Sequence, residues 1–340
     1  MKLKHQIIET QGMSKKKVLL SKYFIANNEG GLKLEQFEVQ EPSDFQVLVK
    51  IAAFGINRAD LLQLKGLYQP PVGESSILGL EFSGEIVSVG SHVTKFEVGQ
   101  LVAGLCGSGA YSEYFLAHEN LLIPLPDDIP LVEAAGFPEV YGTAVFNLFY
   151  LHSVKEGQKV LIHSAAGGVG LAAIQLLIEN GSEVHAVVGS EEKSKRLECY
   201  EIAEIYNYKS GGYESLLESH KDSFDFILDT IGGSLLDLHV KIIKQYGVIQ
   251  NIGLLGGREG HLDFGKFLTK NLTLSSSTLR SQSLNVKAEL CQKLSSQVIG
   301  KVASGKLSLN IHEVLDAGEI HKAFEILRSN QNFGKIIVRW

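Results

Sequence analysis

The stretch that decides the fold is Lys159-Val-Leu-Ile-His-Ser-Ala-Ala-Gly-Gly-Val-Gly-Leu171. Its apolar run predicts a short buried strand, its glycines a tight turn, and its last residues the start of a helix. Gly167, Gly168 and Gly170 carry no Cβ, so a phosphate-bearing ligand can approach the backbone closely there. The N–H groups and the dipole of the following helix then face the phosphates. The stretch therefore predicts a dinucleotide site.

A second predicted strand, Glu183–Val188, completes a strand–helix–strand unit with the first. Folds that prefer NAD place Asp or Glu at the end of this strand, where the carboxylate binds the ribose 2′-OH. This strand instead ends in Gly189-Ser190, and Lys193 follows within one turn. A hydroxyl and an ammonium can bind a 2′-phosphate, so the pattern favours NADPH over NADH. The alternative is that Ser190 only caps a helix and that Lys193 is a solvated surface charge.

Composition narrows the class of protein. A chain of 340 residues supports about two domains, and 44% hydrophobic with 21% charged residues is ordinary for a globular protein. A net charge of −6 argues against general nucleic-acid binding, and no apolar run is long enough to span a bilayer. The three cysteines are scattered without a CxxC pair, and the polar residues 1–17 lack the apolar core of a secretory signal. We therefore expect a cytoplasmic protein.

The pattern of elements changes twice along the chain. Residues 18–125 predict a β-rich domain with one short helix at 57–65, and from Val160 onward strands alternate with helices. Such alternation is typical of an α/β fold with a parallel sheet covered on both faces. After Thr278 a long amphipathic helix, 284–303, is followed by a second helix and a closing strand. We expect these last elements to return to the first domain, which makes that domain discontinuous.

Four motifs carry a resemblance to a known family. They are Asn57–Gln63, Ile77–Gly84, Ala165–Gly170 and Asn332–Lys335. With them the chain resembles the zinc-free branch of the medium-chain dehydrogenase/reductases, the quinone oxidoreductases. Asn57–Gln63 together with Leu228–Ser234 make it most similar, within that branch, to the tumour-suppressor-induced quinone oxidoreductase-like proteins.

The resemblance implies the architecture. Residues 139–278 are expected to form a Rossmann dinucleotide-binding domain with a doubly wound parallel sheet. Residues 1–138 and 279–340 are expected to form a GroES-like catalytic domain. Homologues of this kind commonly pair the edge strand near Leu272–Ser276 across a twofold axis, so we expect a homodimer or homotetramer.

The resemblance also identifies the two positions that decide whether a catalytic zinc ion can bind. Zinc-dependent relatives have a Cys where this chain has Asn57, and a His where it has Leu80. Neither side chain can replace a thiolate or an imidazole on zinc, so we expect no catalytic metal. We interpret single strand histidines such as His163 and His185 as core residues. Without a Lewis acid, alcohol oxidation is disfavoured, and hydride transfer to a conjugated acceptor fits better.

By resemblance, Asn57 and Tyr68 are the candidate catalytic residues. Each expected cofactor contact has an ordinary structural alternative: Asn57 as a helix cap, Tyr68 and Phe333 as packing aromatics, Thr143 as a plain helical residue, Lys335 as a surface cation. The expected contacts with NADPH are Asn57, Tyr68 and Thr143 at the nicotinamide; Ala166, Gly167, Gly168 and Val169 at the pyrophosphate; Ser190, Lys193 and Tyr208 at the 2′-phosphate and adenosine; Asn251, Gly253 and Leu254 at a strand end; and Phe333 and Lys335 closing over the cofactor.

The function implied is an NADPH-dependent reductase of quinones or enones that binds a small molecule in an apolar cleft, for which Leu67, Leu80, Phe137 and Leu254 are candidates. Tyr68 is the local candidate for a proton donor, because a phenol with a pKa near 10 suits an acid better than a base. A second interpretation is reduction of the carbon–carbon double bond of an enal or an enoyl thioester. A third is a non-catalytic role, crystallin-like or RNA-binding.

Overall fold

The computed structural model describes residues 18–27 and 30–340, so the expectation for residues 1–17 lies outside the described residues. The chain forms two compact units. The first comprises Met1–Pro138, Val314–Ser329 and Ile336–Trp340, and the second comprises Glu139–Glu313 and Asn330–Lys335. Within the described ranges, no helix combines the length and apolar character needed to cross a membrane.

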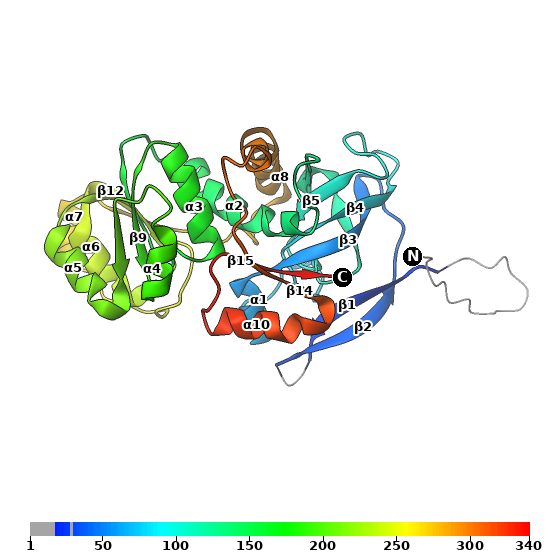
Figure 1. The fold of residues 1–340 in the computed structure, drawn as a ribbon, viewed down its shortest axis with the longest axis horizontal. Coiled ribbons are helices and arrows are strands. Elements are labelled where there is room, and N and C mark those ends of the chain that lie inside the picture. Colours follow the sequence, from blue (N-terminus) through cyan, green and yellow to red (C-terminus); the bar gives the residue numbers. More distant parts are fainter. Residues whose placement is uncertain (1–17, 28–29) are drawn as a thin grey trace, which may run out of the picture. The chain divides into compact units, whose positions relative to one another are not determined.

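The first unit is built on a seven-stranded sheet with the order β14-β15-β3-β4-β5-β7, and β6 also pairs with β3 (Figure 1). A separate two-stranded sheet pairs β1 with β2 in antiparallel fashion. The large side chains in the core of this unit include Phe54, Phe82 and Tyr111, all fully buried. The strands are β1 Leu20–Ala26, β2 Leu32–Glu38, β3 Gln46–Ile56, β4 Glu81–Val89, β5 Leu101–Leu105, β6 Tyr114–His118, β7 Leu122–Pro124, β14 Ile311–Asp316 and β15 Lys335–Arg339.

The described part of this unit contains the α-helices α1 (Arg58–Leu64) and α10 (Ile320–Arg328). Helix α10 buries Ile320, Ala323, Phe324 and Leu327, whose spacing places them on one face of a helix. Among the described residues of this unit there are also three short 3-10 turns. The three turns are Glu119–Leu121, Glu133–Gly136 and Ala317–Glu319.

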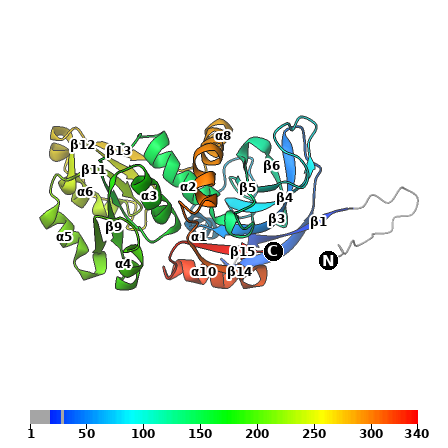
Figure 2. The same cartoon turned by 45° about the horizontal axis from the view of Figure 1, so that its top comes forward.

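The second unit contains a six-stranded parallel sheet with the order β10-β9-β8-β11-β12-β13. This order is that of a doubly wound sheet, so the predicted α/β fold is confirmed. Helices α3 and α4 lie on one side of the strands and α5, α6 and α7 on the other (Figures 1 and 2). The strands are β8 Lys159–Ile162, β9 Glu183–Val188, β10 Glu204–Asn207, β11 Phe224–Asp229, β12 Ile243–Asn251 and the edge strand β13 Thr273–Ser276.

The crossover helices owe their position to apolar faces that cover this sheet. Helix α3 is nearly all apolar and buries eight residues between Gly170 and Leu177, as expected for a helix packed on a parallel sheet. The helices are α3 Gly168–Glu179, α4 Glu191–Leu197, α5 Gly212–Ser219, α6 Leu236–Ile242 and α7 Phe264–Thr269, with 3-10 turns at Tyr208–Ser210 and Gly233–Leu235.

Residues 279–313 lie in the second unit, although we expected them from the sequence in the first domain. Side-chain contacts explain the difference. Lys301 and Lys306 both pair with Glu179 of α3, at 2.9 and 2.7 Å. The Ser308 N–H donates to Gln175 Oε1 at 2.6 Å. The segment is therefore fixed to α3.

Two helices in this unit contain a π-helical turn. Helix α2 (Pro138–Val145) continues into the π turn Phe146–Tyr150. The predicted single helix over 284–303 consists of α8 (Leu284–Lys293), a π turn (Leu294–Val298) and α9 (Ile299–Ala303).

A pair of histidines is buried beneath the carboxyl edge of the parallel sheet. His163 follows β8, His239 lies on α6, and both are at most 1% exposed. Their Nε2 atoms are 2.9 Å apart, so one ring donates and the other accepts, and both are neutral. Burial lowers the pKa of both imidazoles, most strongly that of His163. His163 is a core residue, as expected.

We predict that this pair makes the protein acid-sensitive. An unfolded histidine titrates near pH 6.5, whereas the buried rings stay neutral, so below about pH 6.5 the unfolded state binds more protons and stability falls. Each ring should contribute a loss of about 1 kcal/mol between pH 7.5 and 5.5. Urea denaturation at the two pH values should show a smaller loss in His239→Gln than in the wild type. The surface variant His92→Gln should behave like the wild type, and equal losses in all three proteins would contradict the prediction.

Candidate active site

The glycine turn after β8 leads directly into α3. Gly167 is the N-cap residue, with an extended backbone and no side-chain cap, and the first helical bond runs from the Leu171 N–H to the Gly167 carbonyl at 2.9 Å. Gly167, Gly168 and Val169 are partly exposed, whereas Ala166 is buried. A helix start with no side-chain cap is a favourable place for an anion, because N–H groups and the helix dipole both point outward there.

Each glycine of the turn meets a different neighbour. A Cβ on Gly170 would lie 2.6 Å from the carbonyl oxygens of both Ser164 and Ala165, which are backbone atoms and cannot move away easily. A Cβ on Gly168 would lie 2.8 Å from Lys335 Cδ and from Val140 Cγ1. Gly170 therefore permits the close packing of helix on turn, and Gly168 makes room for the side chain of Lys335.

The segment Asn330–Lys335 closes over this turn. The Gly334 N–H donates to the Ala166 carbonyl at 2.9 Å, and Gly334 forms a parallel bridge with Gly167. Phe333 and Lys335 are buried, at 6% and 3% exposed. The predicted closing residues are thus brought to the glycine turn by backbone pairing.

The end of β9 brings together the residues expected at the 2′-phosphate. Ser190 is the N-cap of α4, and its Oγ accepts from the Lys193 N–H at 3.3 Å, so the structural alternative holds for its oxygen. The Lys193 ammonium donates to the Asn330 carbonyl at 2.6 Å. Tyr208 lies beside the strand end, because a Cβ on Gly189 would be 2.7 Å from its hydroxyl.

A carboxylate orders the next strand ends. Asp229, the last residue of β11, accepts from the N–H groups of Ile231 and Gly232 at 2.7 to 3.1 Å. Asn251, at the end of β12, donates to Asp229 Oδ2 and to the Gly253 carbonyl, both at 2.8 Å. Asn251 and Gly253 are thus held together at the carboxyl edge, and Leu254 beyond them is 52% exposed.

Thr143, the remaining candidate of the second unit, lies on α2 and is partly exposed. Its carbonyl accepts from Asn147 Nδ2 at 2.8 Å, and Asn147 Oδ1 in turn accepts from the Ser277 hydroxyl at 2.6 Å. These contacts of Thr143 are structural and involve its backbone.

In the first unit, Asn57 is fixed by a buried carboxylate. Its Nδ2 donates to Glu81 Oε1 at 2.9 Å, and Glu81 is fully buried. Gly55 leaves the space for this pair, since a Cβ there would lie 2.3 Å from the same oxygen. Asn57 also caps α1 in a capping box with Asp60, whose Oδ2 accepts the Asn57 N–H at 2.7 Å.

A second buried contact extends this arrangement. The Tyr111 hydroxyl donates to Asp60 Oδ2 at 2.8 Å, and both residues are at most 1% exposed. Burial, and then the Asp60 carboxylate, raise the pKa of Tyr111 well above its ordinary value, so it remains a neutral donor. The start of α1 is therefore held by two carboxylates, those of Glu81 and Asp60.

The other candidate site residues of the first unit lie either at the surface or in the core. Tyr68 lies in the turn after α1 and is partly exposed, and Leu67 beside it is 65% exposed. Leu80 and Phe137, expected to line an apolar cleft, are buried at 2% and 0% exposed. Both are core side chains in the structure.

Two family models match the chain. The alcohol dehydrogenase GroES-like domain matches residues 43–127, and the zinc-binding dehydrogenase model matches residues 168–296. Together they cover most of both units. The chain belongs to the medium-chain dehydrogenase/reductases and is quinone oxidoreductase-like.

Solved structures of this family are similar over nearly the whole chain. The quinone oxidoreductase of Pseudomonas syringae pv. tomato DC3000 is 28% identical, with a TM-score of 0.83, covering 94% of this chain and 100% of that one. The CurK enoyl reductase is 25% identical, with a TM-score of 0.81, covering 94% and 99%. The Escherichia coli quinone oxidoreductase complexed with NADPH is 23% identical, with a TM-score of 0.83, covering 94% and 100%, and shows the fold alone.

The curated relatives are polyketide synthases much longer than this chain. The low-reducing polyketide synthase drtA of Aspergillus calidoustus is 32% identical over 300 residues, which are 86% of this chain and 12% of that protein. The chain spans between 10% and 15% of the length of such relatives.

The second family model is named for zinc, and the residues of this medium-chain dehydrogenase/reductase do not fit a catalytic zinc ion at the position expected from the sequence. Asn57 offers an amide already bonded to Glu81, and Leu80 is a buried hydrocarbon. Zinc sites of proteins are built from thiolates, imidazoles and carboxylates. A single carboxylate, Glu81, does not make such a set.

Sequence reasoning missed the residues that hold the candidates in place. Glu81, Asp60 and Asp229 are buried carboxylates that bond to Asn57, Tyr111 and Asn251. Arg196 was also missed, and its guanidinium lies 3.9 Å from the ring centroid of Phe333. The position of Asp229 at the end of an apolar strand, before a glycine pair, was the one signal that could have been used.

We predict that Gly170→Ala lowers the free energy of unfolding by about 1–3 kcal/mol, because the new methyl group meets two backbone oxygens. The matched control is Gly300→Ala in α9, where a Cβ meets nothing within 4 Å. That change should stabilise the protein by up to about 1 kcal/mol through helix propensity. Thermal and urea unfolding of both variants measure the difference, and a Gly170→Ala protein as stable as the wild type would show that the turn tolerates the methyl.

Proposed function

We propose that this chain reduces quinones or other conjugated carbonyl compounds with NADPH, without a catalytic zinc ion. The observation that carries the proposal is the carboxyl edge of the parallel sheet. There the uncapped start of α3 follows β8, and the neighbouring strand β9 ends in Gly189-Ser190 without a carboxylate. The first feature suits a pyrophosphate and the second a ribose 2′-phosphate.

The contacts at the end of β9 support the preference for NADPH. Ser190 Oγ accepts from the Lys193 N–H, which leaves its own O–H proton to donate to a phosphate oxygen. An ammonium group has three N–H donors, so the contact of Lys193 with the Asn330 carbonyl is compatible with binding a phosphate. We propose that Tyr208 lies against the adenosine, and that Phe333 and Lys335 cover the pyrophosphate.

The remaining candidate residues are assigned to the reacting end. When bound, the cofactor supplies a hydride to the electron-poor end of the acceptor, whose conjugation spreads the incoming charge. We propose that Asn57, oriented by Glu81, and Thr143 position the nicotinamide, with Asn251, Gly253 and Leu254 at the strand end beside it. The acceptor also gains a proton, which water supplies or which Tyr68 donates.

A specific observation favours a second candidate function, the reduction of the carbon–carbon double bond of an enal or enoyl thioester. CurK enoyl reductase matches at 25% identity, and drtA, a polyketide synthase, matches 86% of this chain at 32% identity. An enoyl thioester is also a conjugated carbonyl, so the same residues would serve. The two functions differ in the acceptor alone.

We predict that Lys193→Ala raises the KM for NADPH about tenfold, a loss of about 1.4 kcal/mol, because one cation at the 2′-phosphate is removed. The KM for NADH should change less than twofold. Lys195→Ala, an exposed lysine of the same helix, is the matched control and should leave both values unchanged. Steady-state kinetics with each cofactor measure this, and an equal effect on NADPH and NADH would count against a 2′-phosphate contact.

We predict measurable NADPH oxidation with quinones such as 1,4-benzoquinone and 9,10-phenanthrenequinone. A parallel series with 2-hexenal and crotonyl-CoA tests the second function. A kcat/KM at least tenfold higher for the quinones supports the first proposal, and the reverse order supports the second. Binding of NADPH without turnover of any acceptor would point to the non-catalytic role.

We predict that Tyr68→Phe slows turnover less than tenfold, because water can replace a phenol as the proton source for a hydride-driven reduction. The comparison is kcat of the variant and the wild type with the best acceptor, together with the Kd for NADPH. A thousandfold loss of kcat at unchanged NADPH affinity would instead make Tyr68 the proton donor.

A further inference from the structure

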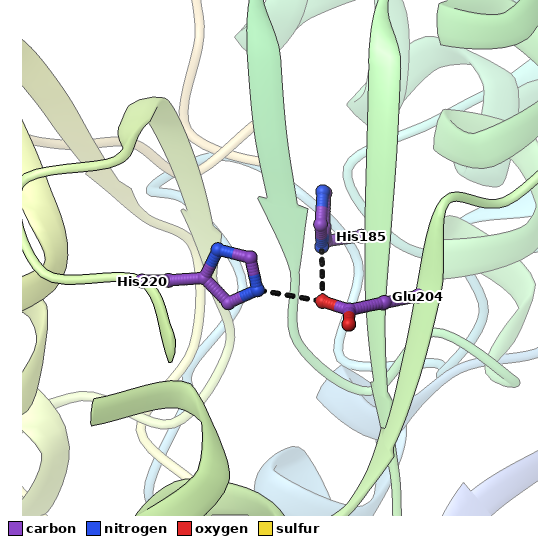
Figure 3. Close-up of side chains that lie close together, drawn as sticks. All are labelled: His185, Glu204 and His220. Carbon is purple, nitrogen blue, oxygen red and sulfur yellow. Dashed lines mark hydrogen bonds and ion pairs between the residues drawn. The ribbon is translucent and has the colours of Figure 1, made fainter. Parts of the chain in front are cut away.

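Three side chains with metal-binding atoms converge in the second unit, away from the candidate cofactor site. His185 lies on β9, Glu204 is the first residue of β10, and His220 follows the last residue of α5 (Figure 3). One donor atom from each lies within 4.8 Å of the others. Within residues 18–27 and 30–340, this is the one group of three such residues close enough to share an ion.

The parallel register creates the cluster. His185 and Glu204 are direct partners in the pairing of β9 with β10, so their side chains leave the sheet on the same face. Glu204 starts its strand, and the cluster therefore lies toward the amino ends of the strands. The glycine turn and the end of β9 lie at the carboxyl ends, on the opposite edge of the same sheet. The cluster is thus separate from the proposed NADPH contacts.

The distances suit a small divalent cation. Glu204 Oε2 lies 2.6 Å from His220 Nε2 and 3.6 Å from His185 Nδ1. With metal–ligand bonds of about 2.0–2.1 Å, the donor atoms of a tetrahedral zinc site are about 3.3 Å apart. Glu204 is half exposed, so small rotations of its side chain can equalise the distances.

Both imidazoles are held by a partner on their other nitrogen. His185 Nε2 donates to Glu183 Oε1 at 2.8 Å, and Glu183 also pairs with Lys159 at 3.0 Å. His220 Nδ1 lies 3.4 Å from the Ser223 hydroxyl. A carboxylate on the outer nitrogen is the usual support of a metal-bound histidine, because it fixes the tautomer with the lone pair facing the ion. His185 is 2% exposed and aims its Nδ1 at the cluster.

A fourth polar atom lies at the same point. The Tyr206 hydroxyl is 2.6 Å from His220 Nε2 and 3.3 Å from His185 Nδ1, and it donates to Glu204. Burial and the Glu204 carboxylate raise the pKa of Tyr206, so it is a neutral hydroxyl. The hydroxyl thus lies beside all three donors, where it can contact the water that holds the fourth position of a zinc site with three protein ligands.

We propose that His185, Glu204 and His220 bind one divalent transition-metal ion, with Zn²⁺ as the best fit. Two imidazoles and one carboxylate are a zinc ligand set, whereas Ca²⁺ and Mg²⁺ prefer oxygen ligands alone. The ion cross-links β9, β10 and the connection from α5 to β11. It is a structural site, and the reduction of acceptors does not run through it.

The test uses the full-length protein without an affinity tag, in a Cys199→Ser background that removes an exposed thiol. After chelator treatment, the protein is titrated with ZnCl2 by calorimetry. We expect one zinc ion per chain, and affinity at least thirtyfold lower in Glu204→Gln and in His220→Gln. His261→Gln is the matched control, because His261 is exposed and faces a single carboxylate, Asp237. Its affinity should match that of the parent.

Two further measurements keep the outcome decisive if a variant is less stable. Saturating Zn²⁺ should raise the unfolding temperature of the parent and of His261→Gln but not that of Glu204→Gln. Co²⁺ should give visible absorption bands of a low-coordinate site in the parent and in His261→Gln but not in Glu204→Gln. Zinc affinity equal in the parent and Glu204→Gln would overturn the proposal, as would the absence of stoichiometric binding. Loss of NADPH oxidation on chelation in a protein that remains folded would contradict a purely structural role.

Discussion

The second unit depends on one backbone contact, the hydrogen bond from the Gly334 N–H to the Ala166 carbonyl at 2.9 Å. Its geometry leaves no alternative residue at position 334. The backbone there has φ +87°, and a Cβ would lie 1.9 Å from the Asn310 carbonyl oxygen. The contact brings Phe333 and Lys335 to the glycine turn, and Gly168 in turn makes room for Lys335. Gly168, Gly334 and Lys335 are thus required together by a single approach of two backbones.

A comparable constraint operates at the start of α1. Glu81 is a fully buried carboxylate, and such a group is costly unless donors surround it. The Asn57 amide supplies one donor, and Gly55 supplies the space. Asn57 is therefore both a structural residue and a candidate for cofactor contact. The hydrogen bond to the Glu81 carboxylate fixes the Asn57 side chain, so its amide has one orientation.

The sequence predicted what depends on local pattern. The apolar run before Gly167 and the glycines after it were sufficient for β8, the turn and α3, and the alternation after Val160 was sufficient for the parallel sheet. The exchange of 279–313 between units was missed because the ion pairs of Lys301 and Lys306 with Glu179 join residues far apart in the chain. The π turn inside the predicted helix 284–303 leaves no mark on an apolar spacing of three and four.

The residues that hold the site in place were missed for the same reason, because their contacts join residues far apart in the chain. Glu81 and Asn57 are 24 residues apart, and no local motif joins them. His185, Glu204 and His220 have the spacing of no known metal motif, and the pairing of β9 with β10 alone brings the first two together. Leu80 and Phe137 were placed in a cleft because they are apolar, but an apolar side chain is as well suited to a core, and that is where both lie.

The contact of Gly334 with Ala166 has a consequence for how the molecule is assembled. The unit that carries the glycine turn is completed by Asn330–Lys335, which come after a segment of the other unit, Val314–Ser329. During synthesis the turn at 167–170 emerges about 160 residues before the segment that covers it, so its final form waits until that segment has been made. A contiguous piece such as 139–313 lacks Asn330–Lys335. A gene fusion or chimaera that contains this piece alone would therefore carry an incomplete second unit.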